Sequence, residues 1–174
     1  LKGDLKITWH EDALEVTAFD MQIAGSNARL AGGGRWLPGQ TFEDIRLEWN
    51  DLSWPLVAEP RLESSSGLVQ LDGRVDDWRL DGRMILRSPP YPEAELSLLG
   101  TGNTTSASIK LDRSAVMGGV LQGNGMANWE GPLTWSANLE GLNIGLATLW
   151  PDWPANIDID LSANQESPQQ GIQI

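Results

Sequence analysis

The side chains that could carry out chemistry are few and widely spaced. His10 is the only histidine, and cysteine is absent. Because a zinc site needs three or four His, Cys or carboxylate ligands, no such site is indicated. Asp76 and Asp77 are adjacent carboxylates, but they lie between two alternating runs, where acidic residues are typical of a hairpin turn. We therefore predict that the protein is not an enzyme and uses no cofactor or metal.

A second pair of carboxylates, Asp158 and Asp160, lies two residues apart in an alternating run. This spacing places both side chains on one face of a strand. Calcium takes six to eight oxygen ligands, which two carboxylates alone do not supply. The pair is therefore predicted to belong to a solvated polar face.

The charge balance excludes two classes of partner. The chain has 24 acidic and 12 basic residues and a net charge of −12. Nucleic-acid binding depends on basic patches that contact phosphates, so no nucleic acid is predicted as a partner. Electrostatic adhesion to an anionic membrane surface is disfavoured for the same reason. No apolar run approaches the ~20 residues of a membrane-spanning helix.

Apolar and polar residues alternate along almost the whole chain. In residues 78–86, for example, Leu80 and Met84 share one face while Arg79 and Asp81 occupy the other. This two-residue period predicts strands with one apolar and one polar face. Turn residues recur every ~8–12 positions, which is typical of antiparallel hairpins. We predict an all-β chain of about thirteen strands, with one short helical turn in residues 142–150 before Pro151.

Glycines interrupt the apolar face and predict its shape. Gly73 and Gly82 both fall on apolar positions, where glycine permits a sheet to bend. A loose repeat joins residues 28–36, 69–78 and 121–129, in which Gly34, Gly73 and Gly125 correspond. The predicted fold is a long, mostly antiparallel and strongly curved sheet. It forms an open, apolar-lined trough, a half-barrel shaped like a taco.

Sixteen residues are predicted to line this trough, because all of them fall on the apolar phase of an alternating run. They are Ile7, Ile45, Leu47, Val69, Leu71, Leu80, Met84, Leu96, Leu98, Ile109, Leu111, Trp135, Leu139, Ile157, Ile159 and Leu161. The chain also has nine tryptophans. Five of them, Trp9, Trp49, Trp54, Trp78 and Trp135, share the apolar phase. An alternative use of the tryptophans is a platform on which sugars stack, which would require exposed rings beside acids and amides.

Three segments together resemble the family of the translocation and assembly module subunit TamB. They are RLEWNDLSWPL (46–56), GLVQLDGRVDDWRLDGRM (67–84) and LTWSANLEGLNIGLATLWPDWPANIDIDLSA (133–163). The most specific piece is GLN (141–143) followed by LWPDWP (149–154) and a strand of alternating Ile and Leu. This family is part of the wider AsmA-like group of bridge-like lipid-transfer proteins with repeating grooves.

The resemblance implies a function. Residues 1–174 would be a single β-trough segment of a larger, repetitive periplasmic protein of a Gram-negative cell. That protein would be anchored in the inner membrane and would reach the outer membrane, where it pairs with the barrel protein TamA. The trough would shield phospholipid acyl chains and support the assembly of outer-membrane proteins.

The expected contacts of the chain are the acyl chains, TamA and neighbouring β segments of the same protein. Unpaired edge strands would also allow the isolated chain to form a dimer, and GIQI (171–174) is a candidate edge. Two other classes stay open at this stage. One is a carbohydrate-binding β-sandwich resembling a lectin, and the other is part of a secreted β-helical enzyme or adhesin.

Overall fold

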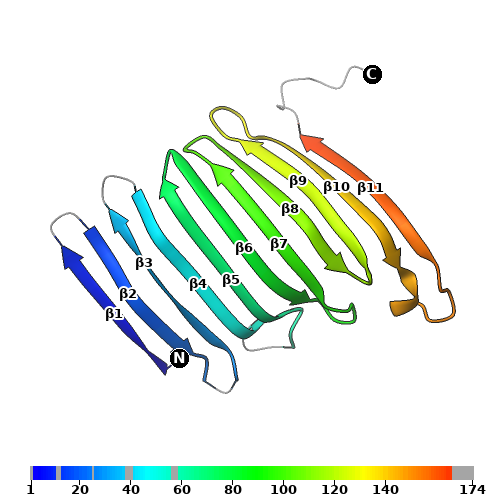
Figure 1. Ribbon diagram of the computed structural model, residues 1–174, viewed down its shortest axis with the longest axis horizontal. Helices are drawn as coiled ribbons and strands as arrows, with labels where there is room; N and C mark the ends of the chain where they lie inside the picture. Colours follow the sequence, from blue (N-terminus) through cyan, green and yellow to red (C-terminus); the bar gives the residue numbers. More distant parts are fainter. Residues whose placement is uncertain (1, 11–12, 25, 38–40, 56–58, 166–174) are drawn as a thin grey trace.

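The computed structural model describes residues 2–10, 13–24, 26–37, 41–55 and 59–165. These residues form eleven strands in one sheet, and each strand pairs antiparallel with the next strand along the chain. The predicted all-β, antiparallel fold is therefore confirmed. The sheet stays open, with β1 and β11 at its two opposite edges (Figure 1). The segment GIQI, predicted to be an edge, lies outside the described residues.

The strands are nine to fourteen residues long. Their bounds are β1 Lys2–His10, β2 Ala13–Gln22, β3 Arg29–Leu37, β4 Thr41–Trp54, β5 Leu62–Arg74, β6 Asp77–Arg87, β7 Ala94–Gly102, β8 Ser106–Val116, β9 Gly119–Asn128, β10 Thr134–Gly145 and β11 Asn156–Gln165. A three-residue 3-10 helix, η1 (Leu146–Thr148), follows β10 in the region where a helical turn was predicted. No helix within the described ranges has the length and apolarity needed to cross a membrane.

Bulges explain why eleven strands replace the thirteen predicted. β4 contains three alternating runs, in which Phe42 is followed by Ile45 and later Trp49 is followed by Leu52. Each step of three residues marks an inserted residue, Asp44 or Asp51, with a positive φ of 49° or 51°. Such a residue shifts the phase of alternation without ending the strand. Short runs that read as separate strands in the sequence therefore belong to one long strand.

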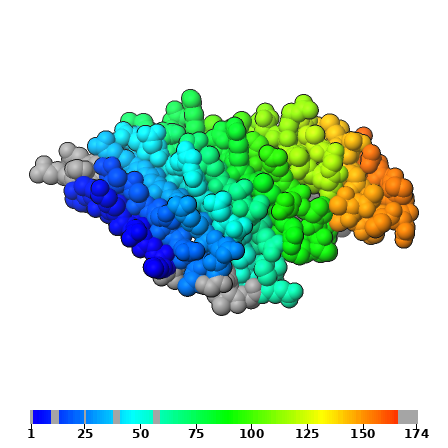
Figure 2. Space-filling model, turned by 60° about the horizontal axis from the view of Figure 1, so that its bottom comes forward, coloured from blue at the N-terminus to red at the C-terminus, as the bar shows by residue number. Residues whose placement is uncertain are grey.

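Two bulges, one at Asp44 in β4 and one at Asn143 in β10, are held by carboxylates from the neighbouring strand. The backbone N–H of Asp44 donates to Oδ1 of Asp72, and the N–H of Asn143 donates to Oδ1 of Asp158, both at 2.8 Å. Because a bulge bends its strand and increases the local twist, these fixed bulges shape the curved sheet. Successive strands follow one another as bands along the elongated body (Figure 2).

The sheet is a single layer without a closed core. In the described part of the chain, the buried apolar residues are Ala28, Ile144 and Leu146. The accessible surface is 12159 Å² for a chain of 19.0 kDa. A compact monomer of this mass exposes about 8,400 Å². The excess arises because both faces of the sheet remain accessible, as in an open trough and unlike a two-sheet sandwich.

The hairpin predicted at Asp76–Asp77 is displaced by one residue. Arg74 pairs with Asp77, so the turn residues are Val75 and Asp76. Gly73, just before this turn, has a φ of +110°. Its Cβ would lie 2.4 Å from the carbonyl oxygen of Asp77, so glycine is required there by the turn itself.

Candidate functional site

The pairing of the strands divides the side chains between two faces, because residues directly opposite each other project to the same side of a sheet. One face, here called the apolar face, contains an uninterrupted row that crosses all eleven strands. The row is Leu5, Phe19, Gly32, Leu47, Val69, Gly82, Leu98, Leu111, Gly123, Leu139 and Leu161. We call it the central row, and the opposite side of the sheet is the polar face.

Glycine recurs in the central row at every third strand, as Gly32 of β3, Gly82 of β6 and Gly123 of β9. The repeat proposed from the sequence aligned Gly34, Gly73 and Gly125, and none of these three glycines lies in the central row. Gly73 lies in β5, one strand too early. The bulges shift the phase within strands, so similar short motifs do not occupy equivalent positions.

The register places all sixteen predicted lining residues on the apolar face. Several are strongly exposed, including Ile7 at 53%, Ile109 at 50% and Leu161 at 56%. None of the paired positions on this face in the described strands is Asp, Glu, Lys or Arg. An uncharged, uncovered apolar surface therefore extends over ten strand spacings, or roughly 48 Å.

The apolar face has a hollow of about 480 Å³ over β1 to β4. Its lining includes residues that the sequence analysis did not select: Leu5, Leu14, Val16, Phe19, Met21, Leu30 and Trp36. In β2, Val16 and Phe19 are both on this face although they are three residues apart, because a bulge inserts one residue between them. A search for two alternating runs that are out of phase by one residue would have found them.

Large rings lie over several glycines of the apolar face. A Cβ added to Gly67 would lie 2.0 Å from Cζ2 of Trp49, and one added to Gly102 would lie 2.3 Å from Cζ2 of Trp78. Each indole thus covers the backbone of the opposite strand, where a side chain would otherwise stand. At these two positions glycine makes room for a ring. The sequence had suggested only that strand glycines permit the sheet to bend.

One indole of the interior is anchored by a buried hydroxyl. Nε1 of Trp49 donates to Oγ of Ser64 at 2.7 Å, and this Oγ donates in turn to the carbonyl oxygen of Ile85 at 2.8 Å. Ser64 is only 6% exposed. Because Ser64 accepts the indole N–H, the Trp49 ring can lie within the apolar face without an unpaired polar group.

Several charged side chains of the polar face form ion pairs with one another. Asp20 receives two hydrogen bonds from Arg29, at 2.8 and 2.5 Å, and further ion pairs join Arg35 to Glu43 and Arg87 to Glu63. The hydrogen bond from the Arg29 guanidinium lowers the pKa of Asp20. All these groups are well exposed, so each pair contributes little to stability.

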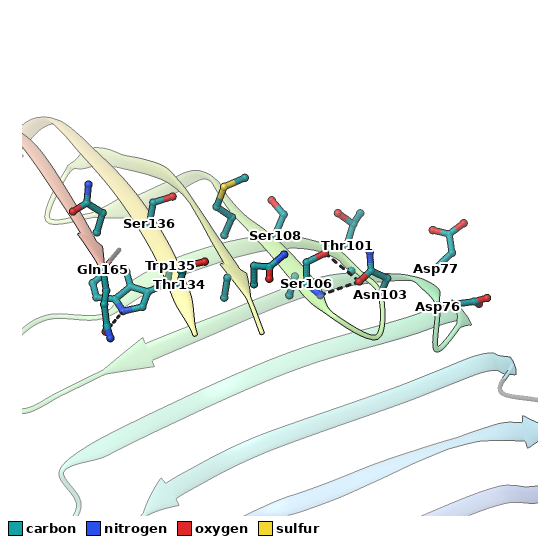
Figure 3. A pocket seen from close by; sticks show the side chains of 16 residues that line it. Asp76, Asp77, Thr101, Asn103, Ser106, Ser108, Thr134, Trp135, Ser136 and Gln165 are labelled. Atoms are coloured by element: carbon teal, nitrogen blue, oxygen red, sulfur yellow. Dashed lines mark hydrogen bonds between the residues drawn. The ribbon is translucent and has the colours of Figure 1, made fainter. Parts of the chain in front are cut away.

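A larger hollow of about 710 Å³ lies near the ends of β6 to β11, and its lining combines Ser, Thr, Asn and Gln side chains with Met126 and Trp135. Thr101, Ser108 and Ser136 point to the same side of the sheet there (Figure 3). Asp76 and Asp77 stand at one end of this hollow. The hydrogen bond from Arg74 lowers the pKa of Asp76. General acid catalysis at neutral pH would require a raised carboxyl pKa, so Asp76 is not suited to that role.

The remaining chemically interesting residues are dispersed. His10 ends β1, and its side chain lies outside the described part of the structure. Asp158 accepts a hydrogen bond from the backbone at the Asn143 bulge. Asp160 lies directly opposite Glu140 in the register of β10 and β11, on the polar face. Within the described ranges, no three His, Cys, Asp or Glu residues are grouped so that they could hold a metal ion.

An open, single-layer β-sheet with one uncharged apolar face defines the class of protein: a β-trough. The chain belongs to the TamB family, because the family model described as "TamB, N-terminal domain" matches residues 2–174. The resemblance found in the sequence is thereby confirmed. No solved structure matches the chain.

Proposed function

We propose that this chain is a β-trough segment of a periplasmic bridge between the inner and outer membranes, and that its apolar face shields phospholipid acyl chains in transit. The observation that supports this most directly is the central row, which continues through all eleven strands without a charged residue. An apolar surface of this size on a soluble monomer indicates a site for an apolar partner.

The energetics favour a surface along which lipid can move. They do not favour a site that holds lipid tightly. Each CH₂ group that leaves water contributes about 0.8 kcal/mol, so a chain of about fifteen methylenes gains on the order of 12 kcal/mol. A lipid starts in a bilayer, however, which is already as apolar as this face. The net transfer energy is then close to zero, and the face acts as a low-barrier path.

Family membership supports the wider setting. We propose that the segment is part of a longer cell-envelope protein anchored in the inner membrane, that it pairs with TamA at the outer membrane, and that it assists outer-membrane protein assembly. Neighbouring β segments would continue the sheet at β1 and β11, whose outer edges have no partner strand among the described residues. The role is non-catalytic. A lectin-like sandwich would need a second sheet, whereas the described strands form one.

Photo-crosslinking of adjacent residues tests the proposal. A photoreactive amino acid is placed at Leu80, Trp135 or Ile157 on the apolar face, and at Arg79, Thr134 or Asp158 as matched controls one residue away on the polar face. Phospholipid adducts are counted by mass spectrometry. We expect adducts from the first set and few or none from the second. Equal yields from Thr134 and Trp135, or adducts from the polar set alone, would contradict the proposal.

A further inference from the structure

The nine tryptophans are not distributed evenly over the sheet. Eight of them lie at a strand end or in a connection between strands, and only Trp49 lies in the middle of a strand. The β1–β2, β3–β4, β5–β6, β7–β8 and β9–β10 hairpins form one edge of the sheet, and the remaining connections form the opposite edge (Figure 1). The strand bounds place five tryptophans at the first edge, namely Trp9, Trp36, Trp78, Trp129 and Trp135, and three at the second, namely Trp54, Trp150 and Trp153. We call these two edges the aromatic rims.

The indole N–H groups differ in whether the protein supplies their acceptor. Trp49, in the interior, donates to the buried Ser64. At the rims, Trp129 donates to the carbonyl oxygen of Thr104 and Trp135 donates to Oε1 of Gln165. By contrast, Trp9, Trp54 and Trp153 are 62–68% exposed, and no protein acceptor is found for their Nε1 atoms among the described residues. An indole has a large apolar ring and a single N–H donor, so it is most stable where an apolar region meets a polar one.

The region between the rims has the width of a hydrocarbon layer. β10 has Trp135 as its second residue and ends at Gly145, ten residues later, which corresponds to roughly 33 Å of strand. The hydrocarbon core of a bilayer is about 30 Å thick. In membrane proteins, tryptophan marks the level at which acyl chains meet headgroups.

From this arrangement we propose that the aromatic rims bind the headgroup and glycerol ends of phospholipids, with the exposed N–H groups of Trp9, Trp54 and Trp153 donating to ester or phosphate oxygens, while the acyl chains lie over the rows between the rims. The inference rests on the proposed function and adds the orientation of the lipid. The lack of charge on the apolar face fits this orientation, because neither a phosphate nor an ammonium group would find a partner between the rims.

The test uses phosphatidylcholine vesicles that contain a small fraction of one of two photoactivatable lipids. One has a diazirine in the headgroup, and the other has it at the end of an acyl chain. After illumination with the chain, labelled peptides are mapped by mass spectrometry. We expect the headgroup probe to label peptides containing Trp9, Trp54 or the Trp150–Trp153 pair. The acyl probe should label the middle of β4 to β8, including Leu47 and Leu80.

The outcomes separate the two proposals. Labelling of the interior by both probes alike would overturn the rim inference while leaving lipid binding intact. Labelling confined to the polar face, or no labelling at all, would overturn the proposed function as well.

A variant pair tests the N–H donor. Trp9→Leu with Trp54→Leu keeps apolar surface but removes two exposed indole donors, so headgroup labelling at the rims should fall several-fold while acyl labelling persists. Phe42→Leu, in the second position of β4, removes a rim ring that has no donor and should leave headgroup labelling unchanged. An equal loss in both variants, or no loss in either, would overturn the role of the indole N–H.

Discussion

The two faces of this sheet are formed by alternate residues of the same eleven strands, yet one has charged side chains that water solvates and the other has apolar side chains that nothing covers. On the polar face, Arg29 and Asp20 satisfy each other and the side chains are solvated, so this face is complete in water. On the apolar face, Trp9 and Leu5 are more than 60% exposed with nothing covering them. The polar face is thus solvated as it stands, whereas the apolar face is the one to which the proposed function assigns a lipid partner. This comparison teaches that function should be sought on the face without reactive groups.

The largest expected effect comes from placing a charge on the apolar face. Leu80→Arg should reduce phospholipid crosslinking at neighbouring apolar positions to near background, because a cation among acyl chains has no partner and is costly to desolvate. The open face leaves the guanidinium access to water, so the fold should survive. Asp81→Arg is the matched control on the polar face and should leave crosslinking unchanged. Circular dichroism checks both folds, and normal crosslinking in Leu80→Arg would contradict the assignment of faces.

Gly67 tests whether the apolar face needs its covering indoles. Gly67→Ala would place a Cβ 2.0 Å from the Trp49 ring, which is held by its bond to Ser64. We expect a loss of about 2 kcal/mol in the free energy of unfolding from overpacking. Urea denaturation provides the measurement. Gly125→Ala is the control, because its Cβ would be 3.6 Å from the nearest atom, and it should be neutral or slightly stabilising. Similar values for the two variants would refute the covering role.

A smaller effect is expected at Ser64, the polar group hidden within the apolar face. Ser64→Ala removes the acceptor of the Trp49 N–H and the donor to the Ile85 carbonyl. Leaving these groups unpaired should cost about 1–2 kcal/mol in the free energy of unfolding. Ser65→Ala changes an exposed neighbour and should cost almost nothing. Trp49 fluorescence should also shift in the first variant only, and an unchanged stability would show that water replaces the hydroxyl.

The smallest effect is expected on the polar face. Because Arg29 lowers the pKa of Asp20, this pair stabilises the folded state above the ordinary Asp pKa, and the stabilisation is lost as the pH falls through the lowered value. Asp20→Asn should therefore lower the melting temperature slightly at pH 7 and not at all in strong acid. Asp160→Asn, on the same face without an ion pair among the described residues, is the control. A large effect at pH 7 would mean that this face is less tolerant than the comparison states.

The fold class and much of the assignment of residues to the two faces could be predicted from the sequence. The alternation of Leu80 and Met84 with Arg79 and Asp81 predicted strands and assigned the residues within each uninterrupted run to a face, because the side-chain period of a strand is fixed at two. The recurring turn residues predicted that the strands are antiparallel. The same rule placed all sixteen predicted lining residues on one side. The absence of charge at those positions is likewise a property of the sequence once the period is known.

Only the tertiary structure decided how the strands are joined. A bulge changes the phase of alternation by one residue, so the sequence did not reveal that Val16 and Phe19 share a face. Nor did it reveal that Gly32, Gly82 and Gly123 are the glycines that share the central row. The Trp49 ring lies over Gly67 because β4 and β5 pair these two residues, which are eighteen positions apart in the sequence. Trp9 and Trp36 lie in one row at the same rim because both are paired with Leu14 of β2. Local periodicity determines which side of a strand a residue occupies, whereas pairing between strands determines its neighbours.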